Sequence, residues 1–389
     1  MGGLAVAGGL ARTGWHVTLL EQDDRIRAGR TALVIWPNGL RALRALGLDA
    51  GLDAIATPLP DMGVRRPDGQ WLVQPTGRVD ERRPVVIHQE DLHDLLVAGL
   101  GDRVNIRTGI RVRDVRVGDG DRPAVSDGRT AFEGDLVVAA DGVDSTVRQR
   151  LAPQARVVSS GWAAWRAVIP WYRAPKISED LVNGETLGNG YRFVAASLGA
   201  AASSGSSGRR GIYWAATVTG ASRPEPPTTQ LALLRRWFAD WPAPIGQLLA
   251  ATEPEDLMPQ EVRELRPLPR TFAYPTEHGG VVLLGDAAHA MPHHLGQGAC
   301  LALEDAATLR TVLRAAVPGP ELRTAIGTYH RLRRPRIQLV VRQVRRMSAV
   351  LQARGRLALG ARRYAGFGSL APRLLGRATA EVARWQPPD

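Results

Sequence analysis

Residues 285–305, GDAAHAMPHHLGQGACLALED, carry the most specific chemistry in the chain. The apolar run VVLL at 281–284 predicts a buried strand that ends at Gly285-Asp286, where an aspartate can bind a ribose or ribityl hydroxyl. The GQG that follows predicts a glycine-rich turn opening a helix, whose free amides at 296–299 form an anion site. A reduced flavin, which is negative at N1 and the C2 oxygen, would be stabilised there.

A second segment offers a site for phosphate. The run DLVVAA at 135–140 predicts a strand ending at Asp141-Gly142, and a helix containing Arg148 follows. Such a corner places backbone amides and Asp141 where the diphosphate of a dinucleotide can bind. The alternative is an ordinary strand–turn–helix corner, with Asp141 and Ser145 as turn and cap residues.

The N-terminal residues read as part of a dinucleotide-binding unit. Residues 2–14 predict a helix with small residues on one face, and 16–20 predict a strand ending at Glu21, where a carboxylate can bind both ribose hydroxyls of an adenosine. The strand and the first two glycines of a G-x-G-x-x-G finger are absent, and Met1-Gly2-Gly3 falls where its last three residues should be. We therefore expect the first strand of the unit to be missing, through a misplaced start codon or a truncation. The alternative is that two glycines simply open a helix.

Further elements define the domains. Helices are predicted at 37–47 and 91–99 and strands near 103–115, whereas from about 157 to 270 short β-like runs alternate with turns, including the loop AASSGSSGRRG and the turn before YRF at 191–193. This pattern predicts an α/β domain interrupted by a mainly β domain, then a helical C-terminus. We expect the α/β domain to comprise residues 1–56, 84–156 and 270–330, the β-rich domain 57–83 and 157–269, and the helical region 331–389.

Composition narrows the class of protein. With 44% hydrophobic and 23% charged residues, the chain has the make-up of a soluble globular protein. A single cysteine, Cys300, excludes an internal disulfide and a cysteine-based zinc site, so we expect a cytoplasmic protein without a metal. The net charge of +12 comes from scattered arginines, with Lys176 the single lysine, so we expect no nucleic-acid partner. No apolar stretch reaches the ~20 residues of a membrane span.

Together these segments resemble the class A, single-component FAD-dependent monooxygenases, the group of para-hydroxybenzoate, salicylate and urate hydroxylases. The resemblance runs from Gly2 to about Arg336 and rests on the finger remnant, Glu21, Asp141–Gly142 and the GDAAH…GQG segment. It implies a Rossmann-like (GR2-type) FAD domain in a monomer or homodimer. It also implies reduction by NADH or NADPH, reaction with O2, and hydroxylation or epoxidation of an aromatic or other electron-rich small molecule through a flavin C4a-hydroperoxide.

The resemblance also assigns residues to FAD. Glu21 would hold the adenosine ribose, Asp286 the sugar chain next to the flavin, and residues 296–300 the pyrimidine side of the flavin. Gln89 stands where the family usually has an arginine, which weakens one diphosphate contact. The full expected set is Gly2, Gly3, Glu21, Gln22, Gln89, Val112, Asp141, Gly142, Arg148, Gly285, Asp286, Gly296, Gln297, Gly298, Ala299 and Cys300.

The β-rich domain should form the roof of a substrate pocket. Its expected walls are Trp165, Arg192, Tyr213, Met291, His293 and His294, although core packing is the usual role of such aromatic residues. Arg192 and Tyr213 resemble polar substrate contacts of urate hydroxylases, whose catalytic aspartate falls at His294, so urate is not expected. His293 takes the place of a proline that faces the flavin. We expect His293, His294, Arg192 and Tyr213 to serve catalysis, with a histidine deprotonating a phenol. The alternative is that both histidines are loop residues without catalytic duty.

Three other functions compete. A flavin halogenase needs a lysine near the flavin and W-x-W-x-I-P, but Trp162-Ala-Ala-Trp165 has the wrong spacing and Lys176 lies outside the flavin domain. A reductase or dehydrogenase of the same fold would consume no O2. A chain without its phosphate turn could bind FAD poorly, or be a non-catalytic or nucleic-acid-binding protein.

Overall fold

The computed structural model describes residues 1–76, 83–118, 122–199, 209–220, 224–352 and 380–388. The helices are α1 (Gly2–Ala11), α2 (Pro37–Ala45), α3 (Asp49–Ile55), α4 (Gln89–Ala98), α5 (Thr146–Leu151), α6 (Glu179–Val182), α7 (Pro227–Trp237), α8 (Ile245–Ala251), α9 (Asp286–His289), α10 (Gly298–Leu313) and α11 (Pro320–Gln352), with 3-10 turns η1 (Pro254–Asp256) and η2 (His293–Leu295). The strands are β1 (Val17–Leu20), β2 (Ala32–Ile35), β3 (Thr57–Pro58), β4 (Gly63–Arg65), β5 (Trp71–Val73), β6 (Val85–His88), β7 (Val104–Arg107), β8 (Asp114–Arg116), β9 (Ala124–Ser126), β10 (Ala131–Glu133), β11 (Leu136–Ala139), β12 (Arg156–Pro170), β13 (Gly184–Leu187), β14 (Tyr191–Leu198), β15 (Gly211–Thr219), β16 (Met258–Arg266), β17 (Ala273–Pro275) and β18 (Gly280–Leu283).

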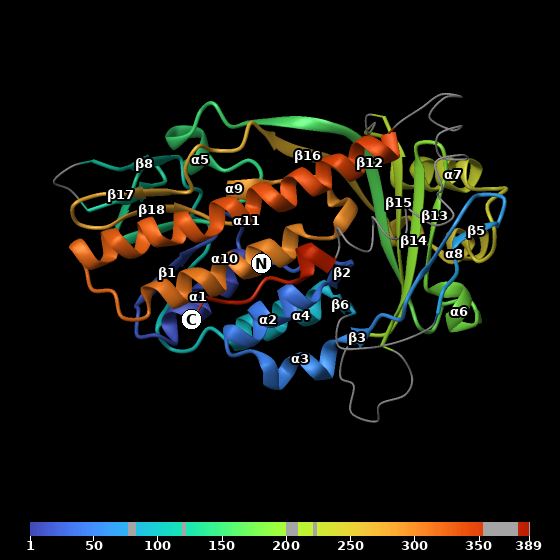
Figure 1. The fold of residues 1–389 in the computed structure, drawn as a ribbon, viewed down its shortest axis with the longest axis horizontal. Helices are drawn as coiled ribbons and strands as arrows, with labels where there is room; N and C mark the ends of the chain where they lie inside the picture. Colours follow the sequence, from blue (N-terminus) through green and yellow to red (C-terminus); the bar gives the residue numbers. More distant parts are fainter. Residues whose placement is uncertain (77–82, 119–121, 200–208, 221–223, 353–379, 389) are drawn as a thin grey trace.

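The α/β part occupies one end of the molecule and the large sheet the other (Figure 1). In the α/β part, β1 pairs in parallel with β7 and β11 pairs in parallel with β18, to which β17 adds an antiparallel edge. Within the described residues β1 pairs with β7 alone and β11 with β18 alone. The predicted strands and helices around the motifs are present, and a missing first strand stays a prediction.

Small residues in α1 let it pack closely against its neighbours. A Cβ at Gly8 would lie 2.8 Å from the carbonyl oxygen of Gly99, and one at Gly2 would lie 2.6 Å from the Leu284 side chain. Real Cβ atoms do not approach other heavy atoms this closely. The backbone contact at Gly8 therefore requires glycine, whereas at Gly2 the end of the Leu284 side chain would have to move. The helix is buried against α10 and the strands of the α/β part, in the main hydrophobic core.

The β-rich part is a seven-stranded sheet in the order β16-β12-β15-β14-β13-β4-β5. Side chains alternate between its two faces. The outer face carries Phe193 and Trp214, which pack with α7 and α8. The opposite face, called here the inner face, carries Tyr213 and Ala196, which pack with Ala32 and Val86 of the α/β part. The turn expected before YRF joins β13 to β14, and most of the loop at 201–211 lies outside the described residues.

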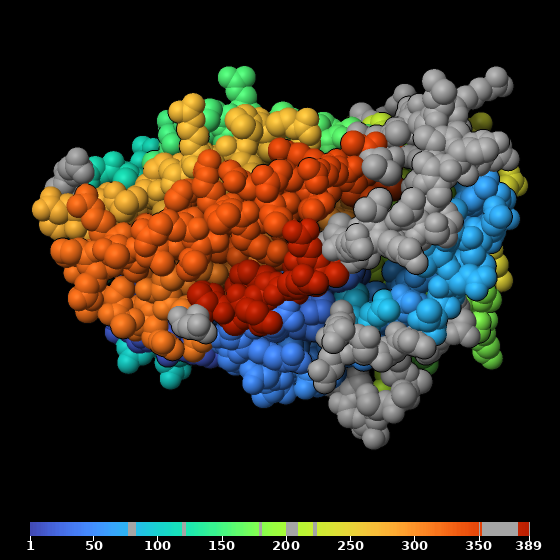
Figure 2. Space-filling model, viewed as in Figure 1, coloured from blue at the N-terminus to red at the C-terminus, as the bar shows by residue number. Residues whose placement is uncertain are grey.

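The long helix α11 crosses the α/β part and reaches the large sheet (Figure 1). Residues 380–388, red in Figure 2, lie between α11 and the N-terminal helices, where Arg41 Nε donates to the carbonyl oxygen of Trp385 at 2.8 Å. Because α11 runs through residue 331 without a break, it joins the last expected segment of the α/β domain, 270–330, to the expected helical region that begins at 331. The domain bounds stay a prediction. None of the described helices has the length and apolarity that a membrane span requires.

Candidate functional site

A cavity of about 1350 Å³ lies beneath α1, between β1 and β11. Every residue of β1 and of β11 lines it, and so do Glu21 and Asp141, which follow the two strands at the edge where α/β sheets bind ligands. It collects seven of the residues expected to bind FAD: Gly3, Glu21, Gln22, Gln89, Val112, Asp141 and Gly142. Residues that are far apart in sequence therefore line one space, large enough for a dinucleotide.

The two carboxylates expected to bind sugar hydroxyls lie near one end of α1. Burial lowers the pKa of the Met1 ammonium, while the nearby charges of Asp286 and Glu21 act against this shift. Glu21 follows β1, and one of its oxygens accepts a hydrogen bond from the amide of Asp23 at 3.1 Å. Asp286 is exposed at the start of α9, directly after β18. Glu21 lines the cavity together with Met1, and Asp286 lies near Met1 outside that lining.

The turn at Gly285 needs glycine and is fastened from two sides. Its φ of 62° and ψ of −140° lie in a region that other residues avoid. Its amide donates to Asp305 Oδ2 at 3.0 Å. Arg148, fully buried in α5, reaches the next residues through a bond of 3.4 Å from Nη1 to the carbonyl oxygen of Ala287. Arg148 thus connects the corner at Asp141 with the turn at Gly285.

The start of α10 has the form of an anion site. Gly296 adopts a left-handed conformation, Gln297 caps the helix, and a Cβ at Gly298 would meet no protein atom within 4 Å. The first amides of a helix lack an intrahelical acceptor, so those at 298–300 are free to bind a ligand. The thiol of Cys300 is buried, accepts from the amide of Trp36, and has its pKa raised to about 12 by burial. Cys300 can therefore contribute only its backbone.

Behind both turns lies a buried ionic network that the sequence did not reveal. Asp305 accepts from His289 Nε2 and from Arg333 Nε, each at 2.6 Å. Burial would raise the pKa of Asp305, but His289 and Arg333 outweigh it and lower the pKa to about 2. The neighbouring Glu304 pairs with Arg333 at 2.8 Å and accepts from Asn38, whose amide nitrogen also donates to Gln297. The network joins the turn at Gly285 to the cap of α10.

The inner face of the sheet carries both apolar and charged side chains. Trp162, Arg166 and Val168 point to this face of β12 by alternation, and Trp162 lies in a small buried cluster with Val262. Arg192 of β14 forms a two-point ion pair with Glu185 of β13, with N···O distances of 2.6 and 3.2 Å. Its third nitrogen donates to the carbonyl oxygen of His294 at 3.3 Å. The inner face thus meets the turn that precedes α10.

His294 is the polar residue most enclosed by this arrangement. It is 4% exposed, both ring nitrogens lack a partner among the described residues, and its ring lies 4.8 Å from that of Trp162 at 67°. Burial, with the charge of Arg192, lowers the pKa of His294 to about 3. Burial, with Arg166 as the next cause, also holds the pKa of His293 well below its usual value. Both rings are therefore neutral near pH 7.

The expected walls of the pocket divide between the two faces. Arg192, His293 and His294 meet at the turn, and Tyr213 lies on the inner face in a cluster with Ala32 and Val86. Trp165 was wrongly expected there: it points to the outer face, packs against Trp237 and donates to Gln230. Trp162, Arg166 and Glu185 were not predicted from the sequence to belong to the site. Because side chains alternate along β12, Trp162 and Trp165 must face opposite sides, and this alternation could have indicated Trp162 as the alternative wall residue. Glu185 reaches Arg192 only through the pairing of β13 with β14, which no local pattern indicates.

The residues present fit FAD. Seven of the residues expected to bind FAD line the cavity, and the open space at Gly298 leaves room for a ring at the free amides of α10. Two buried nitrogens next to these segments, Arg148 Nε and Trp36 Nε1, have no partner among the described residues. A buried donor without an acceptor costs stability unless a ligand supplies one. The donor set therefore suits a phosphorylated, flat, anionic ligand.

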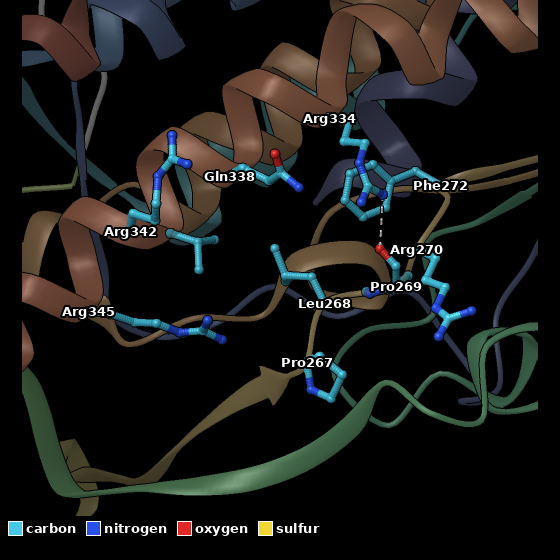
Figure 3. A pocket seen from close by; sticks show the side chains of 10 residues that line it. Pro267, Leu268, Pro269, Arg270, Phe272, Arg334, Gln338, Arg342 and Arg345 are labelled. Atoms are coloured by element: carbon cyan, nitrogen blue, oxygen red, sulfur yellow. Dashed lines mark hydrogen bonds between the residues drawn. The ribbon is translucent and has the colours of Figure 1, made fainter.

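A second cavity, of about 360 Å³, lies between residues 267–272 and α11 (Figure 3). Arg334 Nη1 donates across it to the carbonyl oxygen of Pro269 at 3.5 Å. Arg345 pairs with Glu264 at 2.8 Å and donates to the carbonyl oxygen of Leu265. These bonds fasten α11 to the loop, and none of the residues expected in the site lines this cavity.

Known proteins match nearly the whole chain. Residues 1–344 match the family described as FAD binding domain. The aurachin C monooxygenase/isomerase of Stigmatella aurantiaca is 30% identical over 342 residues, which cover 86% of this chain and 82% of that protein. The 2-heptyl-3-hydroxy-4(1H)-quinolone synthase of Pseudomonas aeruginosa is 32% identical over 351 residues, which cover 88% and 85%. A structure of Klebsiella pneumoniae HpxO complexed with FAD and uric acid matches with a TM-score of 0.80 at 26% identity, covering 98% of this chain and 94% of that one.

These likenesses confirm the mixed α/β fold class, FAD as the cofactor and the resemblance to class A hydroxylases. With the cavity, the turn at Gly285 and the open start of α10, they lead to one conclusion. The chain belongs to the FAD-binding-domain family and is an FAD-dependent monooxygenase.

Proposed function

We propose that this monooxygenase takes two electrons from NADH or NADPH, transfers one atom of O2 to an aromatic or otherwise electron-rich small molecule, and releases the other atom as water. The observation that carries the proposal is the meeting of the inner face with the turn before α10, where Trp162 and Arg192 contact His294. A substrate held between them would lie beside the helix start that suits the flavin. When bound, FAD would pass the electrons of the nicotinamide to O2 and so activate the oxygen.

The chain's own residues then bind, orient and exclude water. The amides at 298–300 would stabilise the negative edge of the reduced ring, and Glu21 and Asp286 would hold the two sugar portions. The remaining residues proposed to bind FAD are those of the cavity and of the two turns described above, including Gly2 and Arg148. The buried side chains of Trp162 and Tyr213 keep the inner face dry, which protects a reactive oxygen species from water.

For His294 we favour hydrogen bonding over proton abstraction. A neutral imidazole offers one donor and one acceptor to a substrate. With a pKa of about 3 it is a weak base near pH 7, and a general base works best with a pKa near the working pH. His293 and Tyr213 remain proposed contacts of the substrate, and Arg192 would position the turn through the carbonyl oxygen of His294.

The substrate class follows from the relatives and from one departure. One relative is named for a quinolone and another for urate, both nitrogen heterocycles. By the resemblance, the catalytic aspartate of urate hydroxylases falls at the position of the neutral His294. We therefore propose a ring other than urate. An aromatic phenol or a hydroxylated nitrogen heterocycle suits both the flat Trp162 and the hydrogen-bonding imidazole.

The test is oxygen uptake by the FAD-loaded protein with NADH or NADPH and a panel of phenols and hydroxyquinolines. We expect at least one ring to accelerate O2 uptake and to gain one oxygen atom, found by mass spectrometry. His294→Ala should lower the share of reduced nicotinamide that yields product, because the ring is held less firmly. Oxidation of the nicotinamide without O2 uptake would favour a reductase or dehydrogenase, and unchanged coupling in His294→Ala would remove its role.

A further inference from the structure

Three charged side chains on the inner face differ in what they contact. Arg192 and Glu185 are bound to each other and largely shielded, with side chains 14% and 19% exposed. Arg166, half-buried on β12, forms no hydrogen bond or ion pair through its guanidinium with any described residue, and its Nε is buried. A guanidinium in such a place is unfavourable unless a ligand accepts its hydrogen bonds.

The strand places Arg166 at the turn before α10. Arg166 lies two residues from Val168 and four from Trp162, so all three share the inner face. Trp162 contacts the ring of His294, and Val168 packs against the cluster that holds Tyr213. Arg166 lies between these two contacts, opposite Ala215 and Met258 on the neighbouring strands, neither of which carries a charge.

We propose that Arg166 is the residue that binds the substrate's ionised oxygen, and that Glu185 prevents Arg192 from doing so. The substrate class is therefore a ring with an acidic hydroxyl, a phenol or an enol-type nitrogen heterocycle, bound as its anion. This inference rests on the proposed function. An ionised hydroxyl raises the electron density of the ring carbons next to it, which is what an electrophilic oxygen transfer requires.

The two arginines are not equivalent in this scheme. The positive charge of Arg192 is neutralised by a carboxylate that meets it at two points, the strong geometry for such pairs. Arg192 therefore acts as a positioning residue for the backbone of His294. The charge of Arg166 remains for a ligand, and a planar fork of donors suits an oxygen anion.

The test compares binding of 4-nitrophenol, at a pH where it is ionised, with that of 4-nitroanisole, which cannot ionise. Both are titrated into FAD-loaded protein by calorimetry, without turnover. We expect the wild type to prefer the phenolate, and Arg166→Gln to reduce that preference about 10- to 100-fold, the usual worth of a hydrogen bond to a charged group. Arg166→Lys should retain part of it. Arg156→Gln, at the exposed start of the same strand, is the matched control and should bind like the wild type.

Glu185→Gln tests the second half of the inference. Releasing Arg192 should raise the preference for the phenolate severalfold, and Glu264→Gln, which removes a similar arginine partner on β16, should leave it unchanged. A wild type without preference, or an Arg166→Gln protein that keeps it, would overturn the proposal. These binding ratios are independent of O2 uptake, so a protein that shows them but consumes no O2 contradicts the proposed function alone.

Discussion

The start of α10 and the inner face of the sheet meet at His294 but are built in different ways. Around α10 the ligand-facing groups are backbone amides, set by glycines at 285, 296 and 298 and fixed from behind by Asp305. On the inner face they are side chains, Arg166, Arg192 and Trp162, brought together by strand pairing. Backbone amides suit a cofactor that stays the same, because a substitution changes them little. Side chains suit a variable substrate, because a single substitution can change which ligand the inner face binds.

The largest effect is expected from the network behind the cofactor turns. Asp305→Ala should lower the free energy of unfolding by about 3–5 kcal/mol, because it removes the carboxylate partner of the buried His289 and leaves the buried Arg333 with Glu304 as its remaining partner in this network. Urea unfolding of the FAD-free protein measures this. Asp114→Ala, which breaks the exposed pair with Arg150, is the control and should cost less than about 1 kcal/mol. Equal effects would mean that the turn at Gly285 does not depend on this network.

A second effect is expected from His294, on the pH dependence of stability. Its pKa is about 3 in the folded protein and about 6.5 in an unfolded chain. Between these values the unfolded state binds the extra proton, so stability is full above the unfolded pKa and falls as the pH drops toward the folded pKa. The slope is about 1.4 kcal/mol for each pH unit.

His294→Gln should remove this contribution and flatten the loss of stability with acid. The measurement is urea unfolding at several pH values on the acid side of neutrality, for the variant and the wild type. His278→Gln, at a histidine in the turn between β17 and β18, serves as the matched control. Parallel curves for His294→Gln and the wild type would show that the ring is not held neutral.

Much of the cofactor site could be predicted from the sequence because its recognition is local. A strand, a glycine turn and a helix start lie within residues 281–300, and their spacing alone defines the free amides. The buried pairing of Asp305 with His289 and Arg333 spans 16 and 28 residues, and no local pattern indicates it. Its acidic and basic members look like ordinary helix-surface residues until α10 and α11 pack together.

The inner face was harder to predict. The β character of residues 157–270 was recognised, but the choice between Trp162 and Trp165 depends on which side of β12 faces the flavin domain. Both residues suit a strand. The register of β12 with β15 and β16, with a bulge between Ser159 and Trp162, determines which of the two tryptophans faces the flavin domain. The neutralisation of Arg192 by Glu185 depends on the pairing of β13 with β14. Resemblance alone assigns Arg192 to the substrate, whereas the ion pair makes it a positioning residue.

The most direct test of the difference between the two regions is the FAD dissociation constant, measured by flavin fluorescence in paired variants. Gly298→Val places a side chain in the open space before α10 and should weaken FAD at least about tenfold, or about 1.4 kcal/mol, with little change in unfolding. Gly246→Val, at an equally open glycine early in α8, should bind FAD like the wild type, as should Arg166→Gln. Normal FAD affinity in Gly298→Val, or an equal loss in Arg166→Gln, would contradict a cofactor site made of the backbone and separate from the inner face.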